Sequence, residues 1–83
     1  MDIKAGQVWV NKYRKDPVCV VEVDGDYICI DWIWQTQDSA WVESDGITKN
    51  HFLSEYEFYA ESMPYHKFKQ WCASWQKGGN DGI

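Results

Sequence analysis

Positive charge is almost missing from the middle of this 83-residue chain. Within residues 16–61 the only fixed positive charge is Lys49, which stands against eleven carboxylates. They are Asp16, Glu22, Asp24, Asp26, Asp31, Asp38, Glu43, Asp45, Glu55, Glu57 and Glu61. The segment therefore has a net charge of −10, whereas residues 1–15 sum to +3 and residues 62–83 to +2. Such a segment repels phosphates, and the basic run at 12–15 is too small to offset it. The charge pattern thus argues against direct nucleic-acid binding.

Membrane and export signals are also absent from the sequence. No apolar run is long enough to span a bilayer, and the first residues lack the apolar stretch of a signal peptide. The three cysteines, Cys19, Cys29 and Cys72, are odd in number and have no Cys-x-x-Cys spacing. We therefore expect reduced thiols in the cytoplasm and no membrane partner.

Motifs for metal binding or catalysis are missing as well. Neither the cysteines nor His51 and His66 have the paired spacing of zinc sites, and the Asp24–Asp26 turn lacks the later ligands of a calcium loop. Ser54 and Ser62 lie at expected turn or cap positions, without a nucleophile elbow, and no glycine-rich loop could hold a phosphate. Carboxylates are numerous, but catalysis needs two with separate pKa values in a cleft. We expect no enzymatic activity, no catalytic residue, no metal and no cofactor.

What the chain has in quantity is aromatic residues, fourteen of them, and short runs of β-forming residues. A buried ring removes roughly 150–250 Å² from water, which offsets the small size of a single domain covering residues 1–83. Alternation and turn residues predict strands at 7–11, 18–23, 27–34, 41–43, 47–52 and 57–60, a tight turn at 44–46 and one helical turn at 53–56. This series predicts a mainly β fold, a small five- to six-stranded antiparallel barrel over residues 4–61.

The two sides of the central hairpin differ in composition. One side of its second strand is expected in the core, and it carries Ile28, Ile30, Trp32 and Trp34. We expect the sides that carry Glu22 and Asp31 to face solvent. This places Ile33 outside, beside Asp31, and leaves the inner side of the first strand to Cys19, Val21 and Val23.

The pattern changes to that of a helix at residues 62–77. Ser62 is a plausible N-cap, Pro64 fits the first turn, and apolar residues recur at helical spacing. These are Tyr65, Phe68, Cys72 and Trp75. We expect this amphipathic helix to close one end of the barrel, the alternative being a helix that docks on a partner or forms a homodimer. Residues 78–83, which begin with a glycine pair, are expected to be a flexible tail.

Three phrases and the order of the strands suggest a family. The phrases are Lys4-Ala5-Gly6-Gln7-Val8-Trp9, Val20-Val21-Glu22-Val23-Asp24-Gly25-Asp26-Tyr27 and Phe52-Leu53-Ser54-Glu55-Tyr56. Together they resemble the short SH3-like barrel proteins of bacteriophages and prophages, over roughly residues 4–61. The resemblance implies an SH3-like barrel, and for a phage protein the cytoplasm would be that of the host cell. The C-terminal helix lies outside the pattern. The resemblance brings no functional residue with it, since members of that group mostly have no known activity.

The grouping of acids with large rings predicts a surface for another protein. Carboxylates spaced along strands can stand in for phosphates and occupy the arginines and lysines of a nucleic-acid-binding groove, as in small acidic phage proteins that block host nucleases or defence complexes. The candidate partner-binding residues are Glu22, Asp24, Asp26, Tyr27, Asp31, Trp41, Glu43 and Asp45.

The alternative is an aromatic cage for a small cation, a nucleotide-like ring or a modified peptide such as methylated lysine. Asp31 or Glu43 would supply the charge. The candidate rings are Trp9, Tyr27, Trp32, Trp34, Trp41 and Tyr59.

Overall fold

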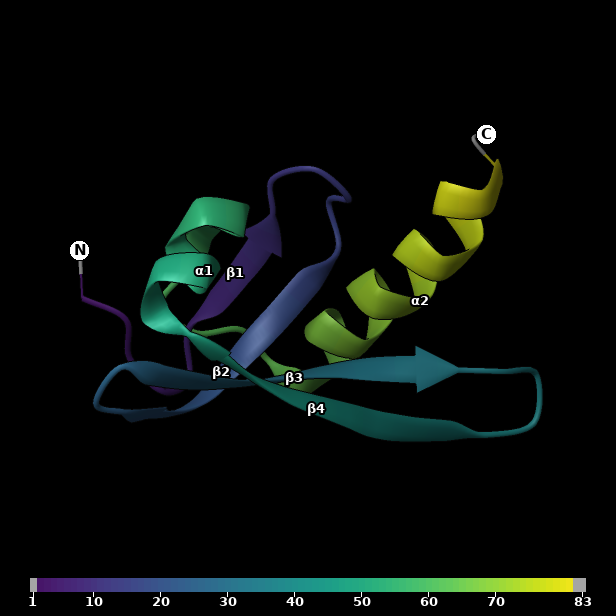
Figure 1. The fold of residues 1–83 in the computed structure, drawn as a ribbon. Coiled ribbons are helices and arrows are strands. Elements are labelled where there is room, and N and C mark those ends of the chain that lie inside the picture. Colours follow the sequence, from purple (N-terminus) through teal and green to yellow (C-terminus); the bar gives the residue numbers. More distant parts are fainter. Residues whose placement is uncertain (1, 82–83) are drawn as a thin grey trace.

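The computed structural model describes residues 2–81. Within this range five strands and two helices follow one another (Figure 1). They are β1 (Val8–Asn11), β2 (Pro17–Asp24), β3 (Tyr27–Gln35), β4 (Ala40–Thr48), α1 (Lys49–Glu55), β5 (Tyr56–Ala60) and α2 (Tyr65–Asp81). The mainly β class is confirmed. The second helix, the five-residue β5 and the tight β2–β3 turn, in which Gly25 has a φ of 58°, also lie near their predicted places.

The strands form one sheet in the order β4-β3-β2-β1-β5, and each neighbouring pair is antiparallel. In the part of the chain that the structure describes, β4 and β5 do not pair with each other, so the sheet is open and the predicted closed barrel is not observed. Helix α1 connects these two edge strands and contacts β3, β4 and β5. Its side chains therefore cover the gap that sheet hydrogen bonds would close in a barrel.

The fourth strand corrects one prediction. Ser44, Asp45 and Gly46 do not form a turn, because β4 pairs without interruption along all of β3, with Gly46 opposite Cys29. The segment after β4 is helical rather than extended. It begins where the Thr48 hydroxyl accepts a hydrogen bond from the His51 N–H at 3.3 Å, an N-cap contact that competes with continuation of the strand.

The two faces of the sheet are named here by the helix that covers each. The α1 face carries Trp9, Val18, Val20, Ile28 and Ile30, which form the main core with Ile3, Phe52 and Tyr56. Phe52 is fully buried, its ring 4.9 Å from that of Trp9 and stacked on that of Tyr56 at 5.0 Å. Most of the apolar surface that a domain of this size can bury therefore lies between α1 and the sheet.

The α2 face carries a smaller, second core of Val8, Ile33, Phe68 and Cys72. Ile33 was predicted outside but is 3% exposed, because α2 lies across this face instead of closing a barrel end. Helix α2 starts at Tyr65, after Pro64, whose carbonyl accepts the Lys67 and Phe68 N–H groups. It continues through the glycine pair to Asp81, where a tail was expected, and the rest of that tail, residues 82–83, lies outside the described residues.

A bulge in β2 explains the other error in face assignment. The register with β3 shifts between Val20 and Glu22, so Val21 has no partner of its own. Val18 and Val20 are consequently buried in the main core, whereas Val21, predicted inside, is 48% exposed. Val23 keeps its predicted side, opposite Ile28, but is 38% exposed. No helix among the described residues is long and apolar enough to cross a membrane.

Candidate functional site

The predicted binding residues divide between the two faces of the sheet. On the α2 face, Glu22 pairs with Cys29 and Asp24 pairs with Tyr27, while Asp31 follows two residues after Cys29. Asp26 lies in the tight turn that joins these strands. Five of the eight candidates, Glu22, Asp24, Asp26, Tyr27 and Asp31, are thus brought together around the β2–β3 hairpin.

The other three candidates lie on the α1 face of β4. Trp41, Glu43 and Asp45 alternate along the strand, opposite Trp34, Trp32 and Ile30 respectively. The Trp41 indole N–H donates to Glu43 Oε2 at 2.7 Å, which orients both side chains. Because the two groups face opposite sides of the sheet, one flat partner surface cannot contact all eight residues.

The candidate carboxylates form no ion pair among the described residues. Among the described residues the two ion pairs are Arg14 with Asp16 at 3.1 Å and His51 with Glu55 at 3.4 Å, and neither involves a candidate acid. The hydrogen bonds made by the candidates come from neutral donors. The Ser44 hydroxyl donates to Asp31 at 2.6 Å, and the Gly46 N–H donates to Asp45 at 2.9 Å. Neutral donors fix the position of a carboxylate without cancelling its charge.

The six rings proposed for a cage do not form one site. Trp9 is buried in the main core and donates its indole N–H to Gln7, and Tyr59 packs against Trp71 with ring centroids 4.6 Å apart. Tyr27 is exposed at the distant β2–β3 hairpin. Trp34, predicted to be buried, is 39% exposed, because β2 pairs with β3 only as far as Asp31 and leaves the end of β3 uncovered on the α1 face.

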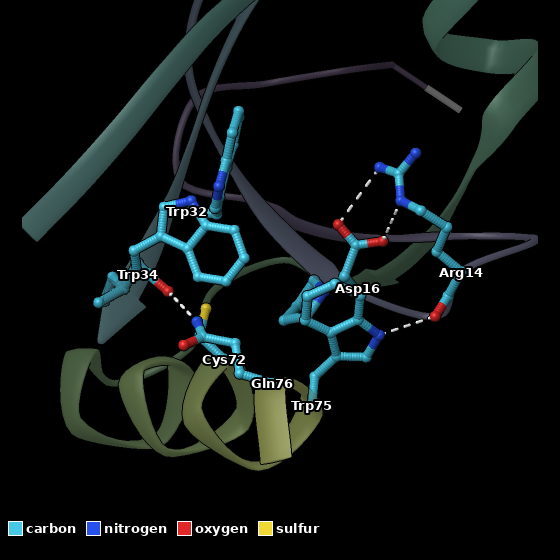
Figure 2. Close-up of a pocket in the computed structure, with 9 residues that line it drawn as sticks. Arg14, Asp16, Trp32, Trp34, Cys72, Trp75 and Gln76 are labelled. Carbon is cyan, nitrogen blue, oxygen red and sulfur yellow. Dashed lines mark hydrogen bonds and ion pairs between the residues drawn. The ribbon is translucent and has the colours of Figure 1, made fainter. Parts of the chain in front are cut away.

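Two of the proposed cage rings, Trp32 and Trp34, line a cavity of about 180 Å³ together with Trp75, which was not among the candidates. The cavity lies between the end of β3, the 12–16 loop and α2. Figure 2 shows Trp32 and Trp34 on one side, the Arg14–Asp16 ion pair on the other, and residues of α2 forming the third wall. The residues on α2 are Cys72, Trp75 and Gln76.

The walls of this cavity are held by hydrogen bonds between distant segments. The Trp75 indole N–H donates to the Arg14 carbonyl at 2.8 Å, and a local bond, in which Asn11 Oδ1 accepts the Arg14 N–H at 2.8 Å, holds the loop itself. On the opposite wall, Gln76 donates to the Ile33 carbonyl at 2.7 Å and accepts the Gln35 N–H at 3.1 Å. Gln76 thereby supplies hydrogen-bond partners to the backbone of β3 beyond the point where its pairing with β2 ends.

The same ion pair borders a second hollow of about 240 Å³ on the α1 face. Its polar lining includes Asp45, His51 and Glu55, and its floor includes Trp32. Sequence reasoning missed Arg14, Asp16 and Trp75 as residues of a hollow. The Arg14–Asp16 spacing was visible, but only the tertiary contact of Trp75 with Arg14 shows that loop and helix meet.

Three groups among the described residues have displaced pKa values. The pKa of Arg14 is raised, and hydrogen bonding to Asp16 is the largest influence, so the pairing favours the charged guanidinium. Burial raises the pKa of the Cys19 and Cys72 thiols, which lowers their thiolate fraction and their nucleophilicity.

No cluster of three or more potential metal ligands occurs within residues 2–81. Comparison of the chain with family models, curated proteins and solved structures found no match.

Proposed function

We propose that this is a non-enzymatic binding protein whose acidic strands occupy a basic surface of another protein, with a phage-type inhibitor of a host nuclease or defence complex as the specific form. One observation carries the proposal. The six candidate carboxylates lie on β2, β3 and β4 and in the turn between β2 and β3. None of them has an ion-pair partner among the described residues, in a chain of net charge −5. Uncompensated charge on exposed strands attracts an opposite surface over long distances and accelerates encounter.

The test is affinity capture from a bacterial lysate at low salt, followed by elution with rising salt and measurement of affinity for the eluted protein. The variant replaces Glu22, Asp24 and Asp26 with lysine. All three side chains are exposed and make no hydrogen bond recorded in the structure, so the fold should persist.

The matched control reverses Asp2, Asp38 and Glu57, which are also exposed but lie outside the candidate set. We expect the first variant to lose binding by at least about 100-fold and the control by far less, because close charge pairs couple by roughly 1.5–7 kcal/mol. Equal loss in both variants would show that net charge alone matters, and retention in the first would refute the proposal.

The cavity beside Trp34 and Trp75 favours a second candidate function, the binding of a nucleotide-like ring. Its volume of about 180 Å³ suits one flat ring system, and the Arg14–Asp16 pair offers a donor and an acceptor side by side. Titration with adenosine should quench tryptophan fluorescence in the wild type and in Trp41→Ala, but not in Trp34→Ala. A response that survives in Trp34→Ala would exclude this cavity.

A further inference from the structure

Strand β4 leaves one long edge of the sheet unpaired within residues 2–81. It spans nine residues, Ala40–Thr48, and its backbone pairs with β3 alone, without a register shift. The opposite edge strand, β5, has five residues. Natural proteins usually protect an edge with charged side chains, especially lysine, or with proline, a bulge or short length. The β4 sequence AWVESDGIT contains no lysine or proline, and its charged residues, Glu43 and Asp45, are both acidic, so this edge can accept a strand of opposite charge.

The contacts of Gln76 define which backbone groups of β4 face outward. Gln76 bonds the Ile33 carbonyl and the Gln35 N–H, so these residues direct their backbone groups away from β4. The direction of the backbone N–H and C=O groups alternates along an antiparallel strand. The backbone groups of Trp32 and Trp34 therefore point toward β4, where they bond the backbone of Glu43 and Trp41.

The groups that remain for a new strand are those of Val42, Ser44 and Gly46. The Gly46 N–H already donates to Asp45 Oδ1 at 2.9 Å, whereas its carbonyl lies on the outward side. Val42 and Ser44 each present both a donor and an acceptor, which is the pattern that β-augmentation uses.

The side chains beside this edge exclude one occupant and favour another. If two copies paired antiparallel about Ser44, Glu43 of each would lie directly opposite Asp45 of the other. Like charges in that position destabilise the pairing. A strand that places lysine or arginine at these positions reverses the sign of the interaction, and its basic side chains also approach the exposed Trp41 ring. On the other face, an apolar side chain would contact Val42, which is 52% exposed.

We infer that the free edge of β4 between Ala40 and Gly46 binds an extended, lysine- or arginine-bearing segment of a partner protein as a sixth strand. The inference rests on the proposed function, whose basic partner it supplies with a mode of recognition. Main-chain hydrogen bonds provide the pairing, and Glu43 with Asp45 select the charge.

The experiment uses a capped octapeptide of alternating lysine and valine, with amide exchange followed by NMR. We expect the peptide to slow exchange at Val42 and Ser44 by about tenfold, the effect of one net hydrogen bond, and to leave Trp41 and Glu43 unchanged because they already bond β3. Two control peptides should not protect these amides: one alternates glutamate and valine, and the other has the lysine sequence with alternate N-methylated residues that cannot pair.

Ser44→Pro removes the outward N–H without removing a bond to β3, and it should abolish the protection at Val42. The matched variant Ser44→Ala keeps the N–H, loses the hydroxyl contact with Asp31 and should still bind. If Ser44→Pro fails to fold by circular dichroism, the double variant Glu43→Gln, Asp45→Gln takes its place and should weaken binding at least about tenfold.

Absence of binding by the lysine peptide, or binding without protection of Val42 and Ser44, would overturn the inference. The failure is distinguishable from failure of the proposed function. A protein captured from the lysate that binds Ser44→Pro normally but loses the Glu22, Asp24, Asp26 variant would retain the function and refute strand addition.

Discussion

The two cores of this protein are built in different ways. In the main core a seven-residue helix brings Phe52 against Trp9 and Tyr56, and its ring is tilted by 59° to that of Trp9 and stacked on that of Tyr56. In the second core a seventeen-residue helix contributes two buried residues, Phe68 and Cys72. Polar contacts from α2 reach the β3 backbone and the 12–16 loop around that core. Helix α1 is also bonded to other segments, because the Lys12 N–H donates to the Glu55 carbonyl at 2.7 Å and the Lys49 N–H donates to the Asp26 carbonyl at 2.7 Å. The difference is that these bonds use the backbone groups of α1, whereas α2 also uses the side chains of Trp75 and Gln76.

The two cores support different binding surfaces. The main core supports the whole sheet, including the acidic β2–β3 hairpin. The second core supports the end of β3, and through it the β3–β4 hairpin that presents Trp41 and the free edge (Figure 1). Weakening each core should therefore affect a different region.

The largest effect is expected from Phe52→Ala. Removal of a fully buried ring costs about 3–5 kcal/mol, which is a large share of the stability of a domain this small. Urea denaturation should show this loss, and amide exchange should accelerate in all five strands. A loss below about 1 kcal/mol would contradict the description of Phe52 as the centre of the main core.

Phe68→Ala should cost less, about 3 kcal/mol, since α2 can settle toward the sheet and reduce the space left behind. Exchange should accelerate in α2 and at the end of β3, while Val20 and Ile30 in the main core remain protected. If the amides of Val20 and Ile30 lose as much protection as those of α2, the two cores form one cooperative unit.

Gln76→Ala should cost about 1–2 kcal/mol by leaving the Ile33 carbonyl and the Gln35 N–H without this partner. The expected signature is faster exchange at Gln35. Gln70→Ala is the matched control, because Gln70 lies exposed on the same helix. Equal effects of the two substitutions would show that helix propensity, rather than the contact with β3, explains the loss.

The smallest effect concerns the thiol of Cys72. Burial raises its pKa, so the folded state holds this proton more tightly than the unfolded chain does. Its contribution to stability is complete below the ordinary cysteine pKa and is lost as pH rises above that value. Cys72→Ser should therefore flatten the alkaline decline of the free energy of unfolding, as measured by urea denaturation across the pH range. An unchanged slope in this variant would assign the decline to other groups.

Much of the chain follows from local pattern. Alternation in the segment from Val18 to Trp34 and the Asp24-Gly25 turn predict the β2–β3 hairpin, and the spacing of Tyr65, Phe68 and Cys72 predicts α2. The six candidate carboxylates were also expected to be exposed, at turns or on the outward side of a strand. Four of them are exposed, namely Glu22, Asp24, Asp26 and Asp45. The other two, Asp31 and Glu43, are partly covered by hydrogen-bonded neighbours.

The errors share a cause. Alternation of apolar and polar residues predicts which side chains share a face of a strand, but it does not predict which element covers that face. Ile33 lies on the same side of β3 as Asp31 and would be exposed without α2, while Val21 is displaced by a bulge that no pairing rule predicts from one strand. The turn predicted at residues 44–46 had suitable residues, yet continuous pairing with β3 overrides that preference.

The sequence by itself therefore determined the β-rich class, the tight turn at Gly25, the amphipathic helix and the excess of negative charge, because each depends on residues close together in the chain. Tertiary structure decided that the sheet stays open, that α2 covers a face, that the candidate acids divide between two faces, and that Trp32, Trp34 and Trp75 meet beside Arg14. Those outcomes depend on which segments pack together, and packing energy is shared among residues far apart in sequence.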